Sequence, residues 1–318
     1  MNLLRILLPL ILALTALIAA CGDDDGGAQS PAATRRPDHT PIPMLTQREF
    51  PVNTPEARTP YPGVALGYRS FDGQEPLPQL PEGAAVYLSL GDSLNWGCCD
   101  DPEFSSHPRF AHWLSERLNR EVVWVSLAGN GTLRSFLKGE PGASRPQLDV
   151  AEEVIADLRA GGHDVVAITL SIGGNDFLEL RTNLGCGGVP RPECQEAFTQ
   201  ILLDYPGKMQ EVYARLNAAK DPATPVFQNN YYDALNCGLP GDDISVSAVS
   251  MSIFNETILA ATLTGGAFPL DFETAFKGHA CEYISGVDPT YAGYDVMLDL
   301  DIAAYEALPA AYVEPWER

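Results

Sequence analysis

The chain has 318 residues, and its 20 Lys and Arg against 42 Asp and Glu give a formal net charge of −22. An acidic surface of this kind repels nucleic acid and anionic lipid headgroups, so a nucleic-acid-binding protein is not expected. The charge favours solubility and does not by itself identify a substrate.

The N-terminus has the layout of an export signal. Arg5 is its one charged residue, an uncharged apolar run covers residues 6–20, and small side chains precede Cys21. The run is shorter than the roughly 20 residues of a comfortable membrane span, which makes a permanent transmembrane helix the weaker alternative. Residues 17–21 (LIAAC) resemble the lipobox of bacterial lipoproteins, and this resemblance implies cleavage before Cys21 and attachment of lipid to it. The alternative is plain secretion with a chance cysteine. We expect a signal peptide at 1–20 and an exported domain anchored to the cell envelope.

Residues 21–80 are predicted to be a flexible tether. The segment begins with GDDDGG after Cys21, is rich in proline, and has apolar residues without any period. Such a segment buries too little surface to offset chain entropy, and proline-rich chains are extended spacers. Part of residues 60–80 can pack on the edge of the domain that follows, which we place at 81–318.

The rest of the chain alternates between short apolar runs and amphipathic helical periods. The predicted strands cover 84–89, 121–127, 164–171, 225–231 and 267–270. The predicted helices cover 108–118, 147–159, 195–218 (bent at Pro206), 244–263 and 291–308. Alternating strands and helices indicate a five-stranded parallel sheet covered on both faces, in an α/β domain. Ligands of such open sheets bind at the carboxyl ends of the strands.

Six cysteines remain after Cys21, an even number that favours disulfides in an exported chain. Metal binding is the rival, but no paired CxxC or HxxxH pattern supports it, so neither a metal nor a cofactor is expected. Cys186 and Cys194 bracket a short Gly- and Pro-rich loop and form the first expected pair. Cys237 with Cys281 is the second. Cys98 and Cys99 form either a vicinal bridge or two free thiols.

Three motifs follow the first three strands and carry the chemistry. Gly91-Asp92-Ser93-Leu94 places a serine at a strand-to-loop turn, Gly131 follows the second strand, and Gly173-Gly174-Asn175-Asp176 follows the third. Ser93 is a candidate nucleophile. The N–H groups of Ser93 and Gly131 and the side-chain amide of Asn175 are candidate donors of an oxyanion hole. Tyr231 and Tyr232, after the fourth strand, are candidates to line a pocket.

Over about residues 83–308 the chain resembles the SGNH hydrolases, also called GDSL esterases and lipases. The resemblance rests on GDSL at residues 91–94, on Gly131 and on GGND at residues 173–176, in the family's order and each after a strand. It implies a flavodoxin-like three-layer α/β/α sandwich and the hydrolysis of acyl or acetyl esters, with Ser93, Gly131 and Asn175 in the roles given above.

The fourth motif of that family is not matched. The family carries Asp-x-x-His-Pro before the last helix, and the aligned residues here are Ser285, Asp288 and Pro289. Aspartate has a reference pKa near 3.9 and is a weak base at pH 7, unless burial or a neighbouring acid such as Asp92 raises its pKa. The candidate bases are therefore a perturbed Asp288, or His279, since triads are defined by geometry and not by sequence order. His107 and His112 are weaker candidates, and His163 is expected at the opposite rim.

Three functions compete. The first is a surface serine ester hydrolase, an acyl or acetyl esterase or a lipase-like enzyme, acting on a small ester or an acylated carbohydrate or lipid. The second is an impaired relative that binds an acyl or carbohydrate ligand. The third is a lipoprotein that docks another envelope protein. The retained nucleophile and oxyanion residues favour the first function, and the lost Asp/His pair favours the second. We expect a monomer whose contact with the membrane is made by the lipid anchor.

Overall fold

A parallel β-sheet organises the domain in the computed structural model, which describes residues 64–65, 79–97, 105–129, 131–139, 145–184, 186, 191–234 and 244–317. All of these belong to the unit Val52–Arg318. The sheet has six strands in the order β1-β3-β2-β4-β5-β6, and every neighbouring pair is parallel. Their bounds are β1 Val64–Ala65, β2 Ala85–Gly91, β3 Val122–Ser126, β4 Val165–Ser171, β5 Val226–Asn229 and β6 Phe268–Leu270.

The five predicted strands are confirmed as β2 to β6, and β1 is an addition. β1 lies in the segment predicted to be a tether and pairs with β3 at the sheet edge, with Val64 opposite Val125. At this point the proline-rich segment is part of the sheet. A strand of two residues is too short to produce a periodic pattern, so the sequence gives no signal for it. It is recognised by its pairing with β3.

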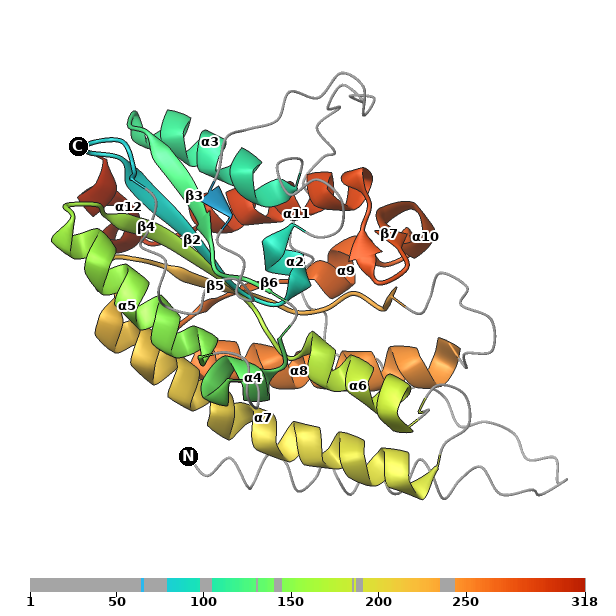
Figure 1. Ribbon diagram of the computed structural model, residues 1–318. Helices are drawn as coiled ribbons and strands as arrows, with labels where there is room; N and C mark the ends of the chain where they lie inside the picture. The colour runs from blue at the N-terminus through green and yellow to red at the C-terminus, as the bar shows by residue number, and fades with distance from the viewer. Residues whose placement is uncertain are drawn as a thin grey trace, which may run out of the picture. The chain divides into compact units, whose positions relative to one another are not determined.

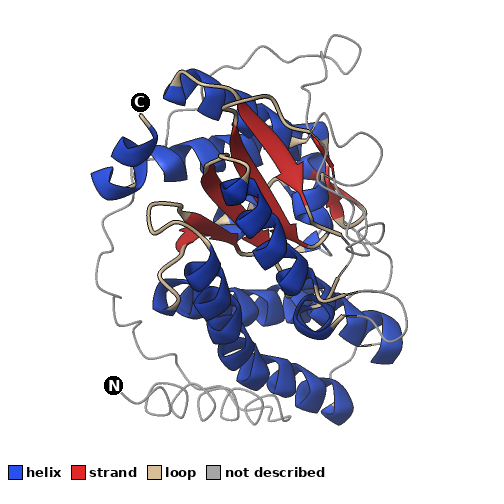
Figure 2. Cartoon of the chain, turned by 60° about the vertical axis from the view of Figure 1, so that its left-hand side comes forward, coloured by secondary structure: helices blue, strands red, loops and turns tan. Residues whose placement is uncertain are grey.

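Helices cover both faces of the sheet (Figures 1 and 2). α3 and α11 lie on one face, while α5, α7 and α8 lie on the other (Figure 1). The main helices are α3 Ser106–Leu118, α4 Leu133–Lys138, α5 Gln147–Ala160, α6 Gly174–Leu184, α7 Pro192–Ala219, α8 Ile244–Thr264 and α11 Tyr291–Glu306. The short ones are α2 Ser93–Trp96, α9 Phe272–Phe276, α10 Ala280–Tyr283, α12 Ala310–Val313 and the 3-10 turn η4 Glu314–Trp316. This is the expected three-layer α/β/α architecture.

The central strands are apolar along their whole length because both of their faces are covered. All seven residues of β2 (AVYLSLG) and all seven of β4 (VVAITLS) are buried. Continuous apolar runs of this kind are typical of parallel sheets. Serines end or nearly end three neighbouring strands, at Ser89 in β2, Ser126 in β3 and Ser171 in β4, where the chain turns toward polar loops.

The helices beside the motifs differ from the prediction. α4 begins directly after the second motif, α6 begins inside the third, and neither was among the predicted helices. α7 starts at Pro192 and runs for 28 residues, with Pro206 inside it. A two-stranded antiparallel hairpin, β7 Ile284–Ser285 with β8 Asp288–Pro289, precedes α11. These elements lacked a clear periodic signal because they are short or begin inside a glycine-rich motif.

The Cys186–Cys194 disulfide is confirmed, with 5.7 Å between the Cα atoms. Cys281 is also disulfide-bonded, and its partner lies outside the described residues. The pairing of Cys237 with Cys281 therefore stays a prediction, and Cys21, Cys98, Cys99 and Cys237 lie outside the described residues. Within the described ranges no helix combines the length and the hydropathy of a membrane span.

Candidate active site

Ser93 begins the one-turn helix α2 immediately after β2. The turn depends on Gly91, whose φ is +107° and whose position would bring a Cβ to 1.8 Å from the carbonyl oxygen of Ser171. No other residue type fits this close approach between the ends of two strands. Asp92 is the N-cap of α2, and its side chain accepts a hydrogen bond from the Leu94 N–H at 3.2 Å. Ser93 itself is half-buried, so its hydroxyl stands at the border between core and solvent.

Hydrogen bonds to the backbone hold α2 on the end of the sheet. Asn95 Nδ2 donates to the carbonyl of Leu90 at 2.8 Å. Ser89 Oγ donates to the carbonyl of Asn95 at 2.9 Å. Both side chains are buried, and an isolated turn of helix has little stability of its own. These contacts therefore help to hold α2 in its orientation.

The second and third motifs lie against each other. Asn175 Nδ2 donates to the carbonyl of Gly131 at 3.0 Å, and the N–H of Leu133 donates to Asp176 Oδ2 at 2.7 Å. The N–H of Gly129, in the same loop as Gly131, donates to the carbonyl of Gly91 at 2.9 Å. The loops after β2, β3 and β4 are thus joined into one polar rim that contains Gly131 and Asn175.

A buried polar cluster underlies this rim and is centred on Asp92. Its carboxylate accepts from Tyr231 Oη at 2.5 Å and from Ser171 Oγ at 2.7 Å. Asn229 Nδ2 donates in turn to Ser171 Oγ at 3.2 Å. Burial raises the pKa of Asp92 to about 7, against the opposing effect of these hydrogen bonds. The cluster connects β2, β4 and β5 directly behind Ser93.

The fourth motif reaches the same end of the sheet through the β7–β8 hairpin. Asp288 is half-buried and lies opposite Ser285 in the hairpin register. β8 lies against α2, with Cα atoms within 8 Å of each other. Burial raises the pKa of Asp288. The carboxylate also helps to raise the pKa of Tyr232 and of Tyr294, after the larger effect of burial on each phenol. Asp288 is thus placed beside the helix that carries Ser93.

His279 lies on an exposed turn before α10. Its Nδ1 is 3.2 Å from Glu282 Oε2, and its ring stacks on Tyr283 with 5.1 Å between centroids. Both of these ring contacts are with residues of α10. The structure therefore brings the loops that carry Ser93, Gly131 and Asn175 and the hairpin that carries Asp288 to the same end of the sheet, and the ring of His279 contacts α10.

A family model for the GDSL-like lipase/acylhydrolase family matches residues 89–296, which include all four motifs. The chain belongs to this GDSL family. The resemblance deduced from the motifs is thereby confirmed, and the domain is of the ester-hydrolase class.

The chain is similar to solved structures of lipases. The lipase Lip_vut3 from a goat rumen metagenome is 22% identical over 69% of this chain and 97% of its own, with a TM-score of 0.50. An extracellular lipase from Streptomyces rimosus is 18% identical over 69% of this chain and 99% of its own, with a TM-score of 0.49. The first of these has the same fold as this chain. A search of curated proteins found no match.

The other three histidines of this GDSL-family domain lie in three different environments. His107 is buried beneath α2, and burial lowers its pKa to about 4. His112 is exposed and lies 3.6 Å from Glu116. His163 Nδ1 is 2.8 Å from the carbonyl oxygen of Ala84, at the amino end of β2 and thus at the opposite rim, as predicted. In the described ranges no group of His, Cys, Asp and Glu side chains could hold a metal ion.

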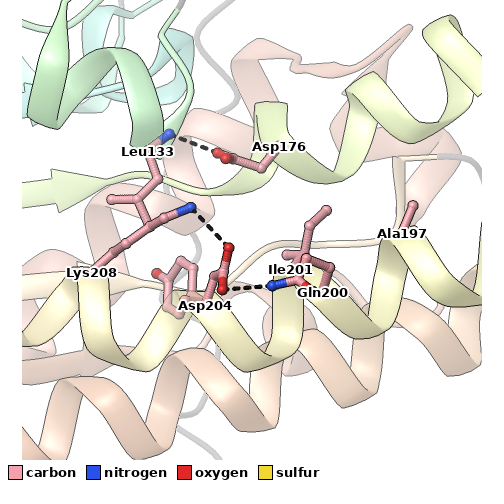
Figure 3. Close-up of a pocket in the computed structure, with 8 residues that line it drawn as sticks. Leu133, Asp176, Ala197, Gln200, Ile201, Asp204 and Lys208 are labelled. Atoms are coloured by element: carbon pink, nitrogen blue, oxygen red, sulfur yellow. Dashed lines mark hydrogen bonds and ion pairs between the residues drawn. The ribbon is translucent and has the colours of Figure 1, made fainter.

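A cavity of about 210 Å³ lies between α4, α6 and α7, beside the second and third motifs (Figure 3). Leu133 and Ile201 contribute apolar surface, while Asp176 and the pair of Asp204 with Lys208 (3.5 Å) contribute charge. Two of its lining residues, Leu133 and Asp176, closely follow Gly131 and Asn175 in the sequence.

The surroundings of four residues near the site did not follow from the sequence. Tyr231 and Tyr232, predicted to line a pocket, are instead buried, with their hydroxyls bound to Asp92 and to the carbonyl of Val287. Ser171 and Asn229, the other members of the Asp92 cluster, had no motif around them. Their position at the carboxyl ends of β4 and β5 was the one available signal.

Proposed function

We propose that the domain is a serine ester hydrolase in which Ser93 is the nucleophile. The observation that carries this proposal is the hydrogen bond between Asn175 and Gly131, which gathers two oxyanion donors at the strand ends where α2 presents Ser93. Converging donors are most useful where a tetrahedral intermediate develops negative charge. A purely structural rim has no need of a half-buried serine at the start of a helix.

The reaction follows from these positions. Ser93 Oγ attacks the ester carbonyl carbon as its proton leaves, and the carbonyl oxygen becomes an oxyanion. The N–H groups of Ser93 and Gly131 and the amide of Asn175 donate to that oxyanion. The C–O bond to the alcohol then breaks, and the alcohol leaves with the proton. Water hydrolyses the acyl-Ser93 ester by the same route and releases the acid.

We propose Asp288 as the group that takes the proton. It lies on the hairpin against α2, and burial raises its pKa, which makes the carboxylate a stronger base. His279 is the alternative. Its ring is engaged by Glu282 on the exposed turn, so it would have to leave that partner to serve Ser93.

The second candidate function is a ligand-binding domain that does not turn over. Ser285 and Asp288 favour it, since they stand where the family carries Asp and His. As an enzyme the domain acts on a small ester or an acylated carbohydrate or lipid, and as a binding domain it takes an acyl or carbohydrate ligand. The domain acts as a monomer held at the cell envelope by lipid on Cys21. Metabolic labelling with a fatty-acid analogue tests the anchor, because label should enter the wild-type chain and be absent from Cys21→Ala.

The experiment that separates the two functions treats the full-length chain with a fluorophosphonate probe and locates the adduct by mass spectrometry. We expect labelling at Ser93, none in Ser93→Ala, a large loss in Asp288→Asn and little change in His279→Ala. A loss confined to His279→Ala would identify that residue as the base. If the wild type is not labelled, while Ser285→Asp with Asp288→His is labelled, the domain is an idle pocket and the binding function is correct.

A further inference from the structure

His107 lies directly beneath the nucleophile helix. It comes from the first turn of α3, and its side chain is 1% exposed. Its Nε2 is 2.9 Å from the carbonyl oxygen of Leu94, the residue after Ser93, and its Nδ1 is 2.8 Å from Tyr87 Oη. The ring stacks on Trp124 with 5.7 Å between centroids. A histidine therefore bridges the sheet and α2 from below.

These partners determine which ring nitrogen carries the proton. A backbone carbonyl only accepts, so Nε2 must be the donor to Leu94. Burial lowers the pKa of His107 to about 4, so the ring is neutral near pH 7 and Nδ1 is an acceptor. Tyr87 Oη therefore donates to Nδ1 and receives a hydrogen bond from Thr169 Oγ1 at 2.7 Å. The chain Thr169–Tyr87–His107–Leu94 has one consistent direction of donation, which holds the ring in a single tautomer.

The contact with Leu94 constrains a helix that cannot constrain itself. α2 has four residues, and the carbonyls at the end of any helix lack partners within it. The Asn95 carbonyl is bound by Ser89 Oγ, and the Leu94 carbonyl is bound by His107. Loss of the second contact would remove one of the supports of α2 and would let the helix shift, which would displace the N–H and Oγ of Ser93.

We propose that His107 is a positioning residue, which orients α2 so that the Oγ and N–H of Ser93 meet the ester carbonyl. The inference rests on the proposed function and adds to it a residue that never touches substrate. It also explains why a polar ring is buried at this position, which costs free energy, while the neighbouring core positions of α3, Phe110 and Leu114, are apolar.

The two ring nitrogens can be tested separately by two substitutions of similar bulk. In His107→Gln the terminal amide occupies the place of Nε2 and retains a donor for Leu94. In His107→Asn the amide occupies the place of Nδ1 and retains only the Tyr87 contact. Both remove the Trp124 stacking. His112→Asn, an exposed histidine on the same helix, is the control.

The measurement is the second-order rate of fluorophosphonate labelling in the full-length chain, at a temperature where circular dichroism shows every variant folded. We expect His107→Asn to react about 10- to 100-fold more slowly than His107→Gln, because a displacement of about 1 Å can cost 10²-fold. With an ester substrate the difference should lie in kcat and not in KM. Equal rates for the two variants would overturn the inference.

A second measurement keeps this inference distinct from the proposed function. If wild-type Ser93 is not labelled, the proposed function fails, and hydrogen exchange of the α2 amides then decides about His107. Faster exchange at α2 in His107→Asn than in His107→Gln supports the positioning of the helix. Equal exchange overturns it.

Discussion

The two halves of the candidate active site are held in different ways. Around Ser93, Gly131 and Asn175, the loops after β2, β3 and β4 are joined by backbone and side-chain hydrogen bonds over a buried cluster. Asp288 instead sits on a hairpin whose strands have two residues each and whose tip, Val287, is 40% exposed. After the roles proposed above for their residues, we call these the oxyanion half and the base half.

This contrast indicates which part of the chemistry demands a fixed geometry. Dipoles that stabilise an oxyanion act best when they are already oriented, so their supports are buried and interlinked. A base needs reach and a suitable pKa, and a short hairpin can present different side chains at little structural cost. The departure from the family's Asp/His pair falls in the base half, while all the family's residues in the oxyanion half are retained.

The largest effect is expected for Gly91→Ala in the oxyanion half. A Cβ at this position would lie 1.8 Å from the Ser171 carbonyl oxygen, on a residue with a φ of +107°. The ends of β2 and β4 would have to separate, so we expect a loss of more than about 3 kcal/mol in the free energy of unfolding, or no folded protein. Urea unfolding followed by circular dichroism measures it. A folded variant of near wild-type stability would show that the strand ends are not rigid.

Asn175→Ala tests the oxyanion half without disturbing the sheet. Removal of one oxyanion donor typically costs about 10² to 10³ in kcat, and the lost bond to Gly131 should cost about 1 kcal/mol of stability. Steady-state hydrolysis of a short-chain nitrophenyl ester gives kcat and KM. The matched control is Asn217→Ala, because Asn217 also donates to a glycine carbonyl, that of Gly265 at 3.2 Å, at an exposed position. A similar loss of kcat in both variants would contradict the role of Asn175.

Stability should fall as the pH rises, and Asp92 should be a main cause. Its pKa in the folded chain is about 7 because of burial, so the native state keeps a proton that the unfolded chain releases near pH 4. The penalty is absent below about pH 4, grows between about pH 4 and 7 and is complete above that, with a size of a few kcal/mol. Asp176, with a pKa raised to about 6 by burial, acts in the same direction. His107, with a pKa lowered to about 4 by burial, acts in the opposite direction below about pH 6.5 and offsets part of the effect. Urea midpoints at pH 5 and pH 8 should therefore differ less in Asp92→Asn than in the wild type. A wild type that becomes more stable toward pH 8 would refute the prediction.

The smallest effect is expected for Gly286→Ala at the tip of the base half. Its φ is +68°, and no atom lies within 4 Å of the position of a Cβ. The cost is then only that of a left-handed conformation, about 1–2 kcal/mol. Thermal unfolding of this variant beside Gly91→Ala compares the two halves directly. A loss as large as that of Gly91→Ala would mean that the hairpin is as tightly constrained as the strand ends.

The sequence predicted those parts of the molecule that have a local signal. Continuous apolar runs predicted β2 and β4, and glycines beside Ser93 and Asn175 predicted the polar rim. The bond from Tyr231 to Asp92 joins residues far apart in sequence, and no spacing rule connects them. His107 was similarly read as a weak candidate base, since the sequence could not show that Leu94 lies above it. The one-turn helix α2 and the two-residue strand β8 are too short to produce a period.

β1 has a practical consequence for where this chain can be shortened. Its backbone occupies the hydrogen-bonding edge of β3, with Val64 and Ala65 opposite Val125 and Ser126. A fragment that begins at residue 81 would leave the N–H and C=O groups of that edge unpaired. Open edges recruit strands from other molecules and promote aggregation. β1 thus covers the edge of β3, and a fragment intended to stay monodisperse should start ahead of residue 64.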